Sequence, residues 1–127
     1  MTIAPISPVL IEDAVARALK EDLGEAGDIT TSAVIPAGRQ ARAVIAARAS
    51  GVIAGAALAR AAFRLVDPTL SVRVERDDGA RIAAGESALA IEGNARAILS
   101  AERVALNFLG HLSGVATATA ALVEAVK

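Results

Sequence analysis

Three long stretches of the chain repeat apolar residues at intervals of three and four, which is the spacing of one face of an α-helix. They cover residues 9–23, residues 56–65 and the chain from residue 95 onward. Ser7 and Pro8 precede the first stretch and suit the N-cap and the first position of a helix. The pattern therefore predicts one helix near the start, one in the middle and a long helical region at the end.

Shorter stretches between these helices alternate apolar and polar residues or carry a brief apolar run, and both patterns indicate β-strands. The predicted strands lie at residues 41–49, 70–75, 81–83 and 88–92, with a short apolar segment between Gly51 and Gly55. The polar residues 27–31 predict a turn. Strands that do not alternate strictly with helices favour the α+β class, and antiparallel strands of this kind need helices over one face of their sheet.

The last helical region has a broad apolar face and a polar face opposite it. Arg103 and Asn107 are neighbours on the polar face because they are four residues apart. Glu102 falls within the apolar arc, so we expect its carboxylate to be buried and either to accept a hydrogen bond or to be protonated. Ser113 and Gly114 predict a break, after which Ser113 caps a second helix.

The composition is that of a globular protein and argues against several functions. The 127 residues suffice for about one domain, with 54% hydrophobic and 21% charged residues. Thirteen basic and fourteen acidic residues give a formal net charge of -1, which argues against a nucleic-acid-binding surface. There is no cysteine, which excludes disulfides and fits a cytoplasmic protein. The chain starts without the features of a signal peptide and has no apolar run of membrane-spanning length, so no membrane association is expected.

Few residues suggest chemistry by themselves. Arg103 fits a solvated helix face, and its guanidinium also has the geometry to hold a carboxylate through two hydrogen bonds. Glu102 fits a structural ion pair or a helix-cap acceptor. His111 is the only histidine and fits a helix-end or interface residue better than a catalyst. Two pairs of adjacent acidic residues are interpreted as solvated-face and turn residues, Glu21-Asp22 and Asp77-Asp78.

One run within the last helical region resembles a known family. Residues 101–119 read AERVALNFLGHLSGVATAT. This run is similar to the linking-helix signature of the quinolinate phosphoribosyltransferases, also called carboxylating nicotinate-nucleotide pyrophosphorylases. Residues 21–23, 27–31 and 51–55 resemble further motifs of that family's N-terminal region. The resemblance spans nearly the whole chain, and its part from residue 102 to residue 119 is specific.

The resemblance implies an enzyme of NAD biosynthesis that works with Mg²⁺. Such an enzyme converts quinolinate and phosphoribosyl pyrophosphate to nicotinate mononucleotide, pyrophosphate and carbon dioxide. The implied fold is the N-terminal α/β sandwich, hammerhead-like, of a type II phosphoribosyltransferase, followed by an α/β barrel. The implied assembly is a homodimer or a higher oligomer, in which the N-terminal domain of one subunit closes the barrel of the other. Arg103 would then reach a quinolinate carboxylate across that interface.

The barrel implied by the resemblance is absent from this sequence. Residues 1–112 are predicted to form the N-terminal sandwich domain, and residues 113–127 to begin the helix that leads to the barrel. The magnesium ligands and the other substrate-binding residues would belong to the barrel. We therefore assign no catalytic residue and no metal ligand within these residues, and we expect this chain alone to be inactive.

Three other interpretations stay open. A related phosphoribosyltransferase-like protein of molybdenum transport would share this architecture but take another substrate. An isolated, non-catalytic dimerisation domain would use its apolar helices to pair with a partner. Residues 79–93 also resemble the hairpin of biotinyl and lipoyl carriers, but the only lysines, Lys20 and Lys127, do not lie in that hairpin.

Overall fold

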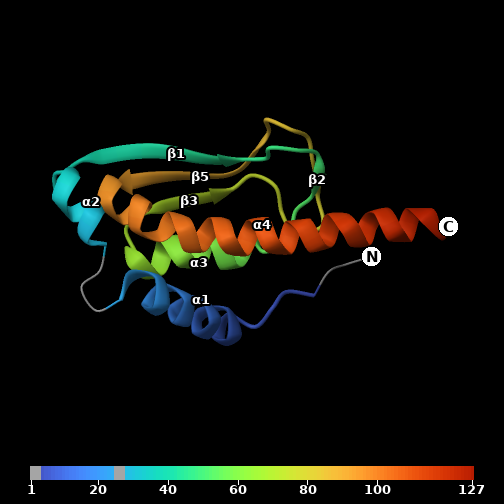
Figure 1. Ribbon diagram of the computed structural model, residues 1–127, viewed down its shortest axis with the longest axis horizontal. Helices are drawn as coiled ribbons and strands as arrows, with labels where there is room; N and C mark the ends of the chain where they lie inside the picture. Colours follow the sequence, from blue (N-terminus) through green and yellow to red (C-terminus); the bar gives the residue numbers. More distant parts are fainter. Residues whose placement is uncertain (1–3, 25–27) are drawn as a thin grey trace.

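The computed structural model describes residues 4–24 and 28–127, which form one mixed assembly of helices and strands (Figure 1). The elements in chain order are α1 (Pro8–Leu23), α2 (Ile29–Val34), β1 (Gln40–Ala46), β2 (Gly51–Val52), α3 (Ala56–Val66), β3 (Ser71–Val74), β4 (Arg81–Ile82), β5 (Ser87–Asn94) and α4 (Ala95–Ala125). Helices and strands do not alternate strictly, so the predicted α+β class is confirmed.

The main sheet has three antiparallel strands in the order β1-β5-β3. The central strand β5 pairs with β1 from Gln40↔Asn94 onward and with β3 from Ser71↔Glu92 onward. In Figure 1 α3 and α4 lie along one face of this sheet, and α1 lies on the other side of α3. The sheet thus has one covered face, as the sequence predicted. A second, two-stranded sheet joins β2 to β4.

The core lies between the covered face of the main sheet and the helices. Its largest fully buried side chains are Phe63, Leu70, Leu89, Ile91 and Val15. Small side chains allow α3 and α4 to approach each other closely. Four alanines of the two helices have no exposed surface: Ala59, Ala62, Ala101 and Ala105. This explains how a chain with 2% aromatic residues still forms a continuous core.

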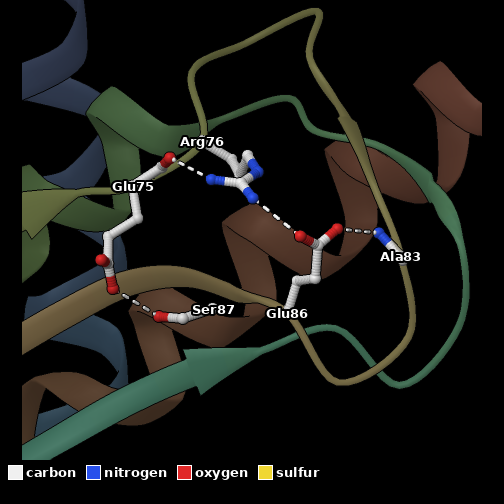
Figure 2. Close-up of polar contacts among 5 residues, drawn as sticks. All are labelled: Glu75, Arg76, Ala83, Glu86 and Ser87. Atoms are coloured by element: carbon white, nitrogen blue, oxygen red, sulfur yellow. Dashed lines mark hydrogen bonds and ion pairs between the residues drawn. The ribbon is translucent and has the colours of Figure 1, made fainter.

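A network of polar contacts ties together the segments that flank β4 (Figure 2). Glu86 accepts hydrogen bonds from the Ala83 N–H and from Arg76 Nη2, each at 2.7 Å. Ser87 Oγ donates to Glu75 Oε1, also at 2.7 Å. The Ala83 N–H first, and Arg76 second, lower the pKa of Glu86 below its ordinary value of 4.5. The carboxylate form of Glu86 is therefore the form that the fold stabilises.

The structure corrects three predicted boundaries. The turn predicted at residues 27–31 contains the start of α2, because the Asp28 side chain caps that helix by accepting from the Thr31 N–H. Gly27 lies outside the described residues. The strand predicted at residues 41–49 ends at Ala46, where the pairing with β5 becomes irregular. Gly93 and Asn94 were predicted to close β5 but belong to it, and Asn94 also caps α4.

The predicted break at Ser113-Gly114 is wrong, because α4 runs unbroken from Ala95 to Ala125. The hydroxyl of Ser113 bonds to Ala54 and caps no second helix. A single glycine lowers the stability of a helix without ending it, and no proline is present to do so. The predicted division into residues 1–112 and 113–127 stays a prediction, and the helix crosses that point without interruption.

The two halves of α4 have different surroundings. Its buried residues all lie between Ala95 and Leu109, whereas the later apolar residues Val115, Leu122 and Val123 are exposed. The end of the helix projects beyond the rest of the described chain in Figure 1. By length and composition alone, α4 is apolar enough to cross a membrane, with a mean hydropathy of 1.3 over 18 residues. The sequence predicted no such segment, because polar residues such as Arg103 and Asn107 interrupt every apolar run of α4.

Candidate functional site

An open groove with a volume of about 1160 Å³ lies between α1 and α4. Its walls are mostly apolar and include Leu10 and Ile11 of α1 and Phe108 of α4. Polar side chains of both helices also line it: Glu21, Asp22, Arg103, Asn107 and His111. The three polar residues of α4 are spaced four apart, which places them in one row along the helix. We call this feature the α1–α4 groove.

Arg103 is held at the groove by an ion pair with Asp22 of α1. Arg103 Nη1 donates to Asp22 Oδ1 at 3.0 Å. The Arg103 side chain is 75% exposed, whereas the Asp22 side chain is only 18% exposed. The sequence had assigned Asp22 to a solvated helix face, and this is wrong. The pairing joins residues 81 positions apart, which no local pattern in the sequence reveals.

Asp28 and Arg103 both line a smaller cavity of about 260 Å³, together with Asp22 and Ser100. The hydroxyl and N–H of Thr31 both donate to the Asp28 carboxylate. These bonds, and to a lesser degree the charge of Arg103, lower the pKa of Asp28. The Asp28 oxygens are therefore engaged in capping α2, and the only carboxylate bonded to Arg103 among the described residues is that of Asp22.

Arg96 binds the end of α2 and does not line the α1–α4 groove. Its Nε donates to the Ile35 carbonyl at 2.5 Å and its Nη2 to the Ser32 carbonyl at 3.1 Å. Both carbonyls belong to the C-terminal end of α2, where helix carbonyls have no partner within the helix. Arg96 thus fixes α2 against α4 and leaves Arg103 as the arginine that faces the groove.

The burial predicted for Glu102 is wrong, because its side chain is only half-buried. It lines a small cavity beside β1 together with Ile98 and Phe63. The predicted apolar arc was too broad on this side, since Leu99 and Leu106 are each 42% exposed. Glu102 therefore lies at the edge of the buried face and makes no ion pair within residues 4–24 and 28–127.

The segment from Gly51 to Gly55 fastens the middle of α4. Thr117 Oγ1 accepts from the Val52 N–H at 2.9 Å, and Ser113 Oγ accepts from the Ala54 N–H at 3.0 Å. A Cβ added at Gly51 would lie 2.5 Å from Thr117 Oγ1. Gly55 has a φ of 91°, and a Cβ added there would lie 2.9 Å from Leu112 Cδ1 and 3.2 Å from the Phe108 carbonyl oxygen. We call these contacts the 51–55 clasp.

Gly55, the last residue of the 51–55 clasp, also leaves α3 without an N-cap side chain of its own. Gly55 occupies the N-cap position of that helix and has no side chain to accept a hydrogen bond. Asp78 Oδ1 accepts from the Ala56 N–H at 2.9 Å and supplies the missing acceptor. Asp78 is exposed in a turn, as predicted, and has this second role as well.

Comparison with known proteins assigns the domain. A sequence profile described as "Quinolinate phosphoribosyl transferase, N-terminal domain" matches residues 28–113. This match spans α2, the sheets, α3 and the part of α4 that carries Arg103. The chain belongs to this family. The α4 wall of the α1–α4 groove lies within the matched residues, and α1 precedes them.

The individual relatives that the chain matches carry names that agree with this family. The chain is 38% identical over 115 residues to quinolinate phosphoribosyltransferase (decarboxylating) 1b of Nicotiana tabacum, covering 91% of this chain and 33% of the relative. It is 42% identical over 120 residues to nicotinate-nucleotide pyrophosphorylase (carboxylating) of Mycobacterium leprae, covering 91% and 41%. The chain therefore spans less than half the length of these relatives.

Solved structures of the family superpose closely on the fold. NadC from Streptococcus pyogenes matches with a TM-score of 0.91 at 38% identity, over 97% of this chain and 44% of that one. The nicotinate-nucleotide pyrophosphorylase from Francisella tularensis matches with a TM-score of 0.88 at 28% identity, over 94% and 42%. These matches confirm that the α+β fold is that of the family's N-terminal domain.

The described part of this domain offers no ready metal site. Within residues 4–24 and 28–127, no three side chains of the types His, Cys, Asp and Glu come together as a metal would require. Asp22 and Asp28 both lie near Arg103, but Asp22 is bonded to the guanidinium and Asp28 to Thr31. The Mg²⁺ expected from the family resemblance thus does not fit these residues.

Proposed function

We propose that this chain is the substrate-capping and dimerising N-terminal domain of an enzyme of NAD biosynthesis. The proposed enzyme converts quinolinate and phosphoribosyl pyrophosphate to nicotinate mononucleotide, pyrophosphate and carbon dioxide. The family assignment and the names of the relatives from Nicotiana tabacum and Mycobacterium leprae support it. Because the chain spans 33% and 41% of those relatives, we propose that the remaining sites lie in an α/β barrel outside these 127 residues.

The observation that carries the proposal is the placement of Arg103. An exposed, anchored guanidinium at the rim of an apolar groove suits a carboxylate on a flat ring. Quinolinate has two adjacent carboxylates on a pyridine, and both must be held so that the ring nitrogen faces the ribose. Arg103 would supply position and positive charge to one of them, and it would transfer no proton.

The assembly is proposed to be a homodimer or a higher oligomer in which this domain closes the barrel of a second subunit. Exposed apolar side chains along α4, such as Leu106 and Leu122, support such a pairing. Mg²⁺ is proposed to be held by barrel residues and not by this domain. We propose the cytoplasm as the compartment, although relatives from plants are named chloroplastic or mitochondrial.

An assay of the complete protein tests this function. The protein is purified as its own gene produces it, its intact mass is measured, and nicotinate mononucleotide is quantified with quinolinate or nicotinate as the acid. We expect product with quinolinate and phosphoribosyl pyrophosphate, and none from the isolated 127-residue chain. A folded, complete protein that forms no product from quinolinate would contradict the proposal and favour a relative with another substrate.

A further inference from the structure

Asp22 occupies an unfavourable place for a carboxylate. It lies in the last turn of α1, which ends at Leu23, and Glu21 stands beside it. The negative end of the helix dipole repels negative charge at this position. The Asp22 side chain is also 82% covered, which adds a desolvation cost. A residue type that opposes local preference in this way marks a site selected for something other than helix stability.

The partner of Asp22 gains position from the contact and little stability. The Arg103 side chain is 75% exposed, and ion pairs this open to water contribute little to folding. A long arginine side chain in water otherwise samples many rotamers. Its single bond to Asp22 removes much of that freedom. The contact is therefore better suited to orienting Arg103 than to holding α1 against α4.

The geometry of the contact leaves the binding edge of the guanidinium open. Only Nη1 bonds to Asp22. Among the described residues, none accepts from Nε or Nη2 of Arg103. These two nitrogens form one edge of the planar group, and a carboxylate binds such an edge through two parallel hydrogen bonds. Arg103 is thus held by one arm while its other edge is free for a ligand.

We propose that Asp22 is a positioning residue that presents Arg103 to a carboxylate of quinolinate, an inference that rests on the proposed function. Asp22 itself touches no substrate and acts through the guanidinium of Arg103. Pre-ordering the arginine lowers the entropic cost of binding the acid. The effect should fall on quinolinate and leave phosphoribosyl pyrophosphate unaffected.

The test compares Asp22→Asn with Asp13→Asn in the complete enzyme. Asp13 also lies in α1 and pairs with an arginine, Arg17 at 3.1 Å, but that pair is exposed and outside the groove. Both changes remove one negative charge. We expect Asp22→Asn to raise the KM for quinolinate about three- to tenfold, with an unchanged KM for phosphoribosyl pyrophosphate, and Asp13→Asn to change neither.

The sign of the change separates positioning from simple repulsion. If Asp22 acted only by its charge, removing it would improve the binding of an anion and lower the KM for quinolinate. An unchanged or lowered KM would therefore overturn the proposal. So would a variant whose melting temperature and both KM values worsen together, because Asp22 would then support the fold. Asp22→Glu, which keeps the carboxylate, should recover part of the loss.

An NMR measurement keeps this proposal distinct from the proposed function. The Nε–H signal of Arg103 in ¹⁵N-labelled enzyme reports its fast motion. It should be ordered in the wild type and in Asp13→Asn, and mobile in Asp22→Asn. If the wild type does not convert quinolinate, the proposed function fails. The Nε–H signal still tests whether Asp22 orders Arg103. Equal mobility of Arg103 in all three proteins would overturn the positioning role.

Discussion

Glu86 makes the stability of the fold depend on pH. It accepts from the Ala83 N–H and pairs with Arg76, and these contacts lower its pKa (Figure 2). A carboxyl whose pKa is lowered by folding stabilises the folded state above its ordinary pKa. That contribution is lost as the pH falls through the lower, folded-state value. Asp28 and Asp67, whose pKa values are also lowered, add to the same acid sensitivity.

We predict that Glu86→Gln lowers stability at pH 7 and flattens its decline in acid. The glutamine keeps the shape but loses the charge that the Ala83 N–H and Arg76 favour. Urea unfolding between pH 7 and pH values below the ordinary 4.5 of the carboxyl measures the effect. Glu12→Gln is the control, because Glu12 is exposed and makes no ion pair with the described residues. Parallel pH profiles of Glu86→Gln and the wild type would contradict this prediction.

At the same scale, the sequence predicted some residues of the site and missed others. Helical spacing alone placed Arg103 and Asn107 on one face, and the structure confirms that both line the α1–α4 groove. Asp22 could not be predicted from spacing, because its partner lies on another helix. Glu102 was misplaced because the helical pattern gives the direction of a side chain but not how far a neighbouring element extends over it.

Side-chain contacts between distant elements fix how these elements are oriented relative to one another. The 51–55 clasp joins β2 to α4 through Ser113 and Thr117, residues more than fifty positions away. This attachment fixes the rotation of α4 about its own axis. It therefore also determines which side chains of α4 face α1. The clasp thus helps to define the wall of the α1–α4 groove.

We predict that Thr117→Val destabilises the domain by about 1–3 kcal/mol. Valine matches the shape of threonine but leaves the Val52 N–H without its acceptor. Thr119→Val is the matched control on the same helix, because the exposed Thr119 hydroxyl bonds only to the Val115 carbonyl. Urea unfolding of both variants gives the comparison. Equal stability of the two variants would show that the bond from the Val52 N–H to Thr117 contributes nothing.

Element types were predictable where the apolar period was long, as in α1, α3 and α4. The break expected at Ser113-Gly114 failed because a polar side chain can serve a distant strand as readily as a helix end. α2 was missed because six residues are too few to show a helical period, and Asp28 is what starts it. A contact between distant segments decided the first case, and a local side-chain cap decided the second.

At the scale of the whole molecule, the described fold presents an open groove between α1 and α4. The groove carries one arginine bound to a carboxylate, and the described residues bring no metal-binding cluster to it. A domain of this kind fits the role of a cap that is completed by a second surface. The exposed apolar end of α4 is consistent with such a surface.

The most direct measurement is the kcat/KM for quinolinate of Arg103→Ala in the complete enzyme. Losing a charge-assisted hydrogen bond of about 1.5–3 kcal/mol should lower this value about 10- to 150-fold. Arg60→Ala is the control, because Arg60 is exposed on α3 and lies outside the groove. We expect a large loss for Arg103→Ala and none for Arg60→Ala. Equal activity of the two variants would contradict the claim that this domain recognises the acid through Arg103.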